Sequence, residues 1–504
     1  MLASLIQERR GDYTSTQANR LIGSSGDQFE LRHHEPNDRA GFSATVFFDR
    51  SSSKYVLGIR GTEDFADLAE DVNRIGIQGF AGDQLVSLYR YYRKLTTPTG
   101  QAVSYSDAEI SMLQAIRVNV LVSPGAFVFG PSRTAALRNE LARDQGHAPL
   151  TGSDASVLPP GAPLVVTGHS LGGHLALLFG RFFPDVTEHV YTYNAPGISP
   201  VGELGLRAMG IPPSPPSLVT NVDAMMGDEL ISRIWSKPGE KVGIATEPGN
   251  PLYQHSIVPL TDALALYGAL GTLSPGLAEN AAAVSGIISA SSPFPEQSLE
   301  ATLDHLGTLL ETGSAPVLVA STNADAAQRE DYYQKLYRAL DGREAGRDYQ
   351  IEFLGGKSAA DLASLAATDV SLRYALSELM PFQAKNADFG SFDGMEFSGA
   401  WFASRAEMLA ATIDANLVDR PFGRTGSADS VRYLDVDAHI GFSLLDDSQY
   451  VQALPMVNSA DRRAELLAFL DGGTYRRLGI FGSESATAGD HLVGLADRDR
   501  LFGG

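Results

Sequence analysis

Gly168-His169-Ser170-Leu171-Gly172-Gly173 is the stretch that decides the fold of this chain. An apolar run at 163–167 precedes it, and a helix-like run at 174–180 follows it. A strand, a tight turn with a serine at its apex and a helix make up the G-x-S-x-G nucleophile elbow. A serine hydroxyl attacks a carbonyl well only when a neighbouring base and its position activate it. Small flanking residues let the helix pass close to the strand. The pattern therefore predicts a nucleophile at Ser170.

Strand and helix patterns alternate on both sides of the elbow. Residues 42–48 and 55–59 predict a hairpin, and residues 64–95 carry helical periodicity. Residues 190–194 and 218–222 predict further central strands. Strands joined by helices form largely parallel sheets that are buried on both faces. We therefore expect an α/β class chain with the α/β-hydrolase fold and a mostly parallel central sheet.

The 504 residues are enough for more than one domain. A segment rich in Gly, Ala, Ser and Pro at 271–298 suggests a boundary. The expected organisation is a catalytic domain at 1–275, a mostly helical region at 276–385 and a mixed region at 386–504. The last region ends in the start of a repeat at 488–504, described below.

Composition excludes several functions. The net charge of −21 argues against nucleic acid as a partner, because phosphate binding needs clustered Lys and Arg. The absence of cysteine excludes disulfides and thiol catalysis. No apolar run approaches the roughly 18 residues of a membrane span, so no transmembrane segment is expected. The first ten residues are too charged for a cleaved signal peptide. Composition predicts nothing about the oligomeric state.

The last residues show a period of nine. Asp490 and Asp499 are nine residues apart, as are Leu492 and Leu501. This is the spacing of the nonapeptide repeat that forms a calcium-binding parallel β-roll. Carboxylates with loop carbonyls make an oxygen cage for a hard cation. We expect Asp490 and Asp499 to be calcium ligands of an incomplete cage, since barely two repeats are present. The alternative is a polar tail with chance spacing.

A serine nucleophile needs a general base and an acid that orients it. In α/β-hydrolases the chain order is serine, then acid, then histidine. His255 lies at a loop-to-helix junction after the last expected central strand, and we expect it to be the base. The other histidines after the elbow helix are less suitable by position: His189, His305, His439 and His491.

Two aspartates compete for the acid. Asp228 lies in a loop before an apolar stretch and is preferred. Asp223 lies almost at the end of the strand at 218–222 and stays open as the alternative. Either could instead cap a helix.

The oxyanion of the reaction needs two backbone N–H donors. Leu171 follows the nucleophile at the start of the helix and should provide one. Thr62 follows the strand at 55–59 and could donate both its N–H and its hydroxyl. A plain strand-ending turn would look the same in sequence.

These motifs together resemble a known family. Gly-Phe-Ser-Ala-Thr-Val-Phe at 41–47, Arg60-Gly61-Thr62, the elbow and Asn194-Ala195-Pro196-Gly197 look like the class 3 lipases over about residues 30–275. The resemblance implies that the Arg-Gly-Thr turn supplies an oxyanion donor. The block at 255–257, the stretch at 372–382 and the terminal repeats resemble bacterial secreted lipases and phospholipases with RTX-type repeats. That resemblance implies an extracellular protein exported by type I secretion.

The expected activity is hydrolysis of lipid acyl esters, as a triacylglycerol lipase or a phospholipase A1, at an oil–water or membrane interface. The chemistry needs no cofactor, and calcium would be structural. The alternatives are an esterase or polyester hydrolase, and a catalytically silent lipid-binding module. Residues 64–80 or the apolar run 116–130 could form a lid over the acyl groove. More often a run such as 116–130 is a buried strand.

Overall fold

The computed structural model describes most of the chain. The described residues are 14–17, 29–61, 81–98, 101–118, 126–146, 157–225, 229, 231–247, 249–292, 298–311, 326–394, 396–419, 432–435, 440–445, 477–481 and 500–502. The chain divides into two compact units. Unit 1 holds residues 1–224 and 229–242, and unit 2 holds residues 225–228 and 243–504. The division therefore lies nearer the N-terminus than the boundary expected at 275.

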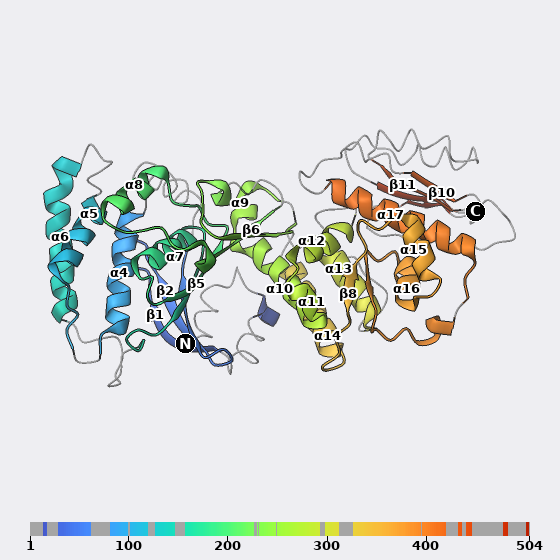
Figure 1. The fold of residues 1–504 in the computed structure, drawn as a ribbon, viewed down its shortest axis with the longest axis horizontal. Helices are drawn as coiled ribbons and strands as arrows, with labels where there is room; N and C mark the ends of the chain where they lie inside the picture. Colours follow the sequence, from blue (N-terminus) through green and yellow to red (C-terminus); the bar gives the residue numbers. More distant parts are fainter. Residues whose placement is uncertain are drawn as a thin grey trace. The chain divides into compact units, whose positions relative to one another are not determined.

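A seven-stranded sheet forms the centre of the α/β fold (Figure 1). Its strands lie side by side in chain order, with β1 and β2 antiparallel, β2 and β3 antiparallel, and β3 to β6 pairing in parallel. The hairpin and the three later central strands agree with the sequence prediction. The strands are β1 (Phe29–Glu35), β2 (Ala44–Asp49), β3 (Lys54–Ile59), β4 (Leu164–His169), β5 (Thr187–Tyr193), β6 (Val219–Ala224) and β7 (Glu240–Ile244).

Helices connect the parallel strands of unit 1. A parallel connection is right-handed in nearly all proteins, so successive connections between neighbouring strands place their helices on one face. These helices are α4 (Gly82–Thr96), α5 (Asp107–Val118), α6 (Ala126–Gly146), α7 (Leu171–Phe182) and α8 (Pro200–Ala208), followed by the short 3-10 turns η1 (Pro216–Leu218) and η2 (Ile231–Arg233). The helix α7, between β4 and β5, indeed packs against α4, and Figure 1 shows the two side by side.

The core of unit 1 lies between the sheet and these helices. One row of side chains crosses five strands in register and is almost fully buried, and α7 and α4 cover this face with apolar and aromatic residues. Tyr92 of α4 meets Phe179 of α7 edge to face, with ring centroids 5.2 Å apart. The row consists of Val46, Leu57, Val166, Val190 and Val219.

Two expectations about this unit are corrected. The sheet was expected to be buried on both faces, yet the strand residues alternating with the core row, such as Val165 and Thr167, are only half-buried. Of the described helices, α4 and α7 pack on the face that carries the core row. The run 116–130 is also not a strand where it is described, because its ends belong to α5 and α6. Residues 119–125 of that run and the other lid candidate, 64–80, lie outside the described residues.

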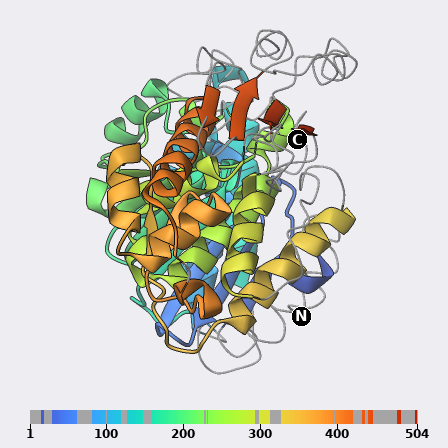
Figure 2. The same cartoon turned by 90° about the vertical axis from the view of Figure 1, so that its right-hand side faces the viewer.

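Unit 2 is mainly helical in its first part, and Figure 2 shows its green-yellow to orange helices from a second side. Its helices are α9 (Pro251–His255), α10 (Ile257–Leu273), α11 (Pro275–Ala278), α12 (Ala281–Ala290), α13 (Ser298–Leu309), α14 (Ala326–Gly342), α15 (Ala359–Ala366), α16 (Val370–Glu378), the 3-10 turn η4 (Gly390–Gly394) and α17 (Gly399–Asp419). Two antiparallel strands, β8 (Ile351–Phe353) and β9 (Phe382–Ala384), lie among them. The described part of the segment rich in Gly, Ala, Ser and Pro, where a boundary was expected, is therefore largely helix.

A second sheet holds β10 (Arg432–Asp435), β11 (Ile440–Leu445), β12 (Arg477–Phe481) and β13 (Arg500–Phe502). The last two strands pair in parallel, Gly479–Phe481 with Arg500–Phe502. Among the helices of the described residues, none is long and apolar enough to cross a membrane.

A buried ion pair ties α10 to α14 in unit 2. Both carboxylate oxygens of Asp262 accept hydrogen bonds from Arg329, each at 2.8 Å. The hydroxyl of Tyr333 donates to the same carboxylate at 2.7 Å, and the hydroxyl of Tyr332 donates to the Asp262 carbonyl at 3.1 Å. Because Asp262 is fully buried, these contacts compensate the cost of removing its charge from water. They fix the start of α10, which directly follows His255.

The glycines of the elbow generate a stability prediction. A Cβ at Gly172 would overlap the backbone of Ile59 and Arg60, whereas a Cβ at the exposed Gly268 of α10 meets nothing within 4 Å. We expect Gly172→Ala to lower the free energy of unfolding by about 1–3 kcal/mol, because backbone must shift to make room. Gly268→Ala should raise it by about 0.5–1 kcal/mol, since alanine loses less entropy in a helix. Urea denaturation measures both, and a Gly172→Ala protein as stable as the parent would contradict the packing described.

Candidate active site

Ser170 occupies the turn between β4 and α7. Its backbone has φ 54° and ψ −125°, a region that non-glycine residues rarely adopt. Such a conformation persists only where the surroundings hold it. The Ser170 N–H donates to the Tyr193 carbonyl at 2.9 Å, and the Ser170 carbonyl accepts from the His174 N–H at 3.1 Å. The nucleophile predicted from sequence therefore has the strained turn that an elbow requires.

Small residues let α7 begin directly against the sheet. A Cβ at Gly168 would overlap the backbone of Gly172 and Gly173, and a Cβ at Gly173 would press on the Ala195 side chain. A Cβ at Gly172 would meet the end of β3. Only glycine fits these positions, as the sequence pattern indicated. The mostly parallel sheet with this elbow after β4 is an α/β-hydrolase fold.

Leu171, the first predicted oxyanion donor, lies at the start of the helix that follows Ser170. Leu171 is the first residue of α7 and is buried. Backbone N–H groups in the first turn of a helix have no acceptor within the helix, and the helix dipole favours negative charge there. The N–H of Leu171 can therefore bind an oxyanion that develops beside Ser170.

The second donor turn lies against the elbow. A Cβ placed on Gly61 would lie 3.3 Å from Ser170 Cβ and would touch the His169 carbonyl. The Arg60-Gly61 turn therefore contacts the nucleophile's own turn. Thr62, the predicted donor, is the next residue and lies outside the described residues.

The predicted base belongs to unit 2. His255 is the last residue of α9, and Ser256 is the N-cap position of α10, so His255 precedes a helix as predicted, but a short helix rather than a loop leads up to it. The His255 side chain is buried, with 6% of the residue exposed. Because Ser170 belongs to unit 1, pairing of the two side chains stays a prediction.

The other histidines have structural roles or lie outside the description. His189 on β5 shares a hydrogen bond with Thr220 at 2.9 Å. His305 is buried on α13, edge to face with Phe382, and burial lowers its pKa to about 4. A histidine kept neutral in this way is a core residue rather than a base. His439 and His491 lie outside the described residues.

Of the two candidate acids, the structure describes only Asp223. Asp228 lies outside the described residues. Asp223 is on β6, and the Lys237 ammonium donates to both of its carboxylate oxygens, at 2.8 and 2.7 Å. Burial raises the pKa of Asp223, and the Lys237 ammonium opposes that rise. Asp223 is therefore committed to an ion pair within unit 1.

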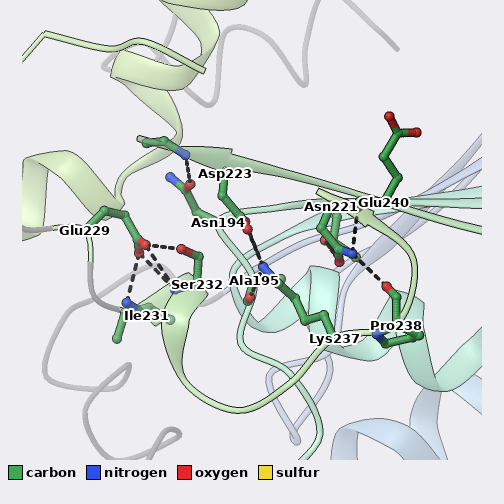
Figure 3. A network of polar contacts seen from close by, with 12 residues as sticks. Asn194, Ala195, Asn221, Asp223, Glu229, Ile231, Ser232, Lys237, Pro238 and Glu240 are labelled. Atoms are coloured by element: carbon green, nitrogen blue, oxygen red, sulfur yellow. Dashed lines mark hydrogen bonds and ion pairs between the residues drawn. The ribbon is translucent and has the colours of Figure 1, made fainter. Parts of the chain in front are cut away.

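Lys237 belongs to a polar network at the carboxyl ends of the strands (Figure 3). Its ammonium also donates to the Ala195 carbonyl at 2.9 Å. The Asn194 side chain accepts from the Ala224 N–H at 2.8 Å and so links the ends of β5 and β6. Glu229 holds η2 through its carboxylate, which accepts from the N–H groups of Ile231 and Ser232 at 3.0 Å each and from the Ser232 hydroxyl.

A second part of the network is buried within the sheet. Thr192 of β5 donates to the Asn221 side chain at 2.8 Å. The amide nitrogen of Asn221 donates in turn to the carbonyls of Pro238 and Glu240. Buried polar groups of this kind are costly unless paired, and here they join β5, β6 and the start of β7.

Sequence reasoning missed Lys237, Glu229 and His174. Lys237 is 14 residues from Asp223 and 42 from Ala195, so no local sequence pattern predicts these two contacts. Asn194 was noticed only as part of a family motif. Its positive φ of 44° is a signal that only the backbone shows.

Metal ligation is not tested by the described residues. Asp490 and Asp499 lie outside them. Among the residues with assigned positions, no group of three or more His, Asp or Glu could hold a metal ion.

His174 makes the elbow helix sensitive to acid. It is fully buried, its Nδ1 hydrogen-bonds the Gly197 carbonyl at 3.1 Å, and burial lowers its pKa from 6.5 to about 4. The unfolded chain then binds a proton that the folded chain does not, so stability is full above pH 6.5 and falls as the pH drops toward 4.

We expect unfolding to cost about 2 kcal/mol less at pH 5 than at pH 7 on account of His174 alone. Replacing it by asparagine, which keeps an N–H donor, should flatten this part of the pH dependence. Urea-denaturation midpoints of the parent and of His174→Asn between pH 5 and 7 measure the effect. Parallel curves for the two proteins would show that His174 is not the group responsible.

Comparison with solved structures finds several lipases among the similar chains. No family model matches the chain, and no curated protein matches it. The lipase of Rhizopus microsporus var. chinensis is 15% identical with a TM-score of 0.23, covering 49% of this chain and 70% of that one. Lipase II of Rhizopus niveus is 14% identical with a TM-score of 0.23, covering 49% and 76%.

The Lip2 lipase of Yarrowia lipolytica is 17% identical with a TM-score of 0.22, covering 45% of this chain and 69% of that one. At these identities and TM-scores, no residue role passes from those proteins to this one. The assignment of the site therefore stands on the geometry around Ser170.

Proposed function

We propose that this protein is a serine carboxylic-ester hydrolase that cleaves acyl esters of lipids. One observation carries the proposal. Ser170 stands at the apex of a strand–turn–helix with φ 54°, and the Arg60-Gly61 turn lies against it. A serine held in this conformation, with a helix N-terminus behind it, is arranged for attack on a carbonyl.

The proposed reaction uses three side chains in chain order. Ser170 Oγ attacks the acyl carbonyl carbon while His255 accepts the hydroxyl proton, and Asp228 orients the imidazole. The N–H of Leu171 and the N–H and hydroxyl of Thr62 stabilise the oxyanion. The tetrahedral intermediate collapses, the alcohol leaves with the proton from His255, and an acyl-enzyme remains. Water activated by His255 then releases the fatty acid.

A lipid substrate is supported by the burial of the nucleophile. Only 1% of Ser170 is exposed, so an ester reaches it only after neighbouring residues move. Movement of this kind at an oil–water surface would couple activity to the presence of an interface. The resemblance of residues 30–275 to class 3 lipases points the same way. Both triacylglycerol and the sn-1 ester of a phospholipid fit the proposed chemistry.

The remaining sequence expectations belong to this proposal. Extracellular location with type I secretion follows from the resemblance of the terminal repeats to RTX-type proteins. Calcium would bind at Asp490 and Asp499 in a structural role, because aspartate oxygens are its preferred ligands. The reaction itself needs no cofactor.

The mechanism predicts loss of activity on removal of one hydroxyl. We expect Ser170→Ala to hydrolyse p-nitrophenyl butyrate at least ~10⁴-fold more slowly than the parent, because the covalent step is lost. A fluorophosphonate probe should label the parent but not this variant. Ser377→Ala, which removes an exposed hydroxyl in unit 2, is the matched control and should behave as the parent. Equal activity in Ser170→Ala would reject Ser170 as the nucleophile, and activity in neither protein would favour the catalytically silent lipid-binding module.

Interfacial activation separates a lipase from an esterase. We expect the rate on tributyrin to rise sharply once the substrate exceeds its solubility and forms droplets, because the interface would favour exposure of Ser170. A pH-stat assay across the solubility limit measures this. Simple saturation below the limit, with no further increase, would favour the esterase or polyester hydrolase. The same assay with phospholipid vesicles distinguishes phospholipase A1 activity.

A further inference from the structure

We infer that Lys237 is a positioning residue for this reaction. Its ammonium joins the carboxyl ends of β5 and β6 beside the elbow. Because it forms an ion pair with Asp223, a different carboxylate serves as the triad acid. The inference rests on the proposed function and deepens it.

The ammonium of Lys237 is saturated by three acceptors. It donates to the two carboxylate oxygens of Asp223, at 2.8 and 2.7 Å, and to the Ala195 carbonyl, at 2.9 Å. A lysine ammonium has three N–H donors, so none is left over. The Lys237 side chain is 1% exposed, whereas that of Asp223 is 21% exposed. A cation so deeply buried is stable only with such partners.

The acceptors lie at the ends of neighbouring strands. Ala195 follows Asn194, whose N–H donates to the Val222 carbonyl at 3.0 Å and whose side chain accepts from Ala224. Ser170 directly follows β4, and its N–H donates to the carbonyl of Tyr193, the last residue of β5. A continuous set of hydrogen bonds therefore runs from the nucleophile through the end of β5 to the end of β6. Lys237 adds further hydrogen bonds to this set, to Ala195 just after β5 and to Asp223 on β6.

The backbone that carries Lys237 is itself fixed. The Gly197 N–H donates to the Ile234 carbonyl at 2.8 Å, and a Cβ at Gly197 would overlap Ser236. The Pro238 carbonyl accepts from Asn221 at 2.8 Å. Because hydrogen bonds hold the chain on both sides of Lys237, the backbone from which its side chain extends has a fixed position. Its contacts therefore set the spacing between the strand ends.

The ion pair also decides which aspartate is suitable as the acid. A triad acid stabilises the imidazolium through its negative charge. The charge of Asp223 is already compensated by an ammonium on both oxygens. Asp228 follows five residues later and has the expected chain order before His255. Lys237 thereby removes Asp223 from competition and leaves Asp228 as the acid.

The test measures kcat, KM and pH profiles on p-nitrophenyl butyrate for Lys237→Met, Asp223→Asn, their double variant and Asp228→Asn. We expect Lys237→Met to lower kcat by ~10–100-fold with KM changed less, because misplaced strand ends displace the reacting groups. The double variant should recover part of this loss, since the single variant leaves the partly buried carboxylate of Asp223 without its ammonium partner. Lys357→Met removes an ion pair with Glu352 in unit 2 and should keep the parent kcat.

The pH profile separates positioning from catalysis. The acid limb of kcat/KM reports the base, and loss of its acid partner should move that limb to lower pH. We expect this shift in Asp228→Asn but not in Asp223→Asn. If Asp223→Asn moves the acid limb to lower pH and loses as much activity as Ser170→Ala, Asp223 is the triad acid and the inference is overturned. A parent-like kcat in Lys237→Met would overturn it as well.

Hydrogen exchange keeps the inference testable if the proposed function fails. Peptides covering 190–198 and 219–225 should exchange faster in Lys237→Met than in the parent, while those covering 359–366 should not change. Full activity in Ser170→Ala would reject the proposed function alone. Unchanged exchange at the strand ends would reject the positioning role of Lys237 whatever the activity shows.

Discussion

The parallel pairing of β4 with β3 and β5 is the constraint on which the rest of this structure depends. Its register places Val166 between Leu57 and Val190, so that the three strands share one buried row. The same register brings the carboxyl ends of the strands to one edge of the sheet. Ser170 is the next residue along that edge, and its N–H is held by Tyr193 at the end of β5. The strained turn is therefore supported by the sheet itself.

Desolvation sets the chemistry of this edge. Burial keeps His174 neutral and raises the pKa of Asp223, and it lowers the pKa of Lys237. Charged groups in such surroundings are stable only when other groups compensate them. The pairing of Lys237 with Asp223 and Ala195 meets that condition and also connects the strand ends. The same ion pair thus supports the strand ends of unit 1 and, on our proposal, excludes Asp223 as the triad acid.

Local patterns predicted the elements well, whereas longer-range features were predicted poorly. The elbow, the β2–β3 hairpin and the junction at His255 each depend on a few consecutive residues, and each appears where expected. The small residues at 271–298 suggested a domain boundary, yet small residues also suit close helix packing, as in α12. Burial of both sheet faces was wrong because composition does not show on which face the connections pass.

The sequence by itself determined the strand–turn–helix with Ser170 at its apex and the order of the triad candidates, because these follow from spacing along the chain. Only the tertiary structure decided the partner of Asp223. The contact joins Lys237 to residues 14 and 42 positions away, and it exists because parallel strands bring distant residues to the same edge. Spacing along the chain predicts which residues are candidates for the reaction, and the packing of the sheet decides which of these candidates are already bound in ion pairs.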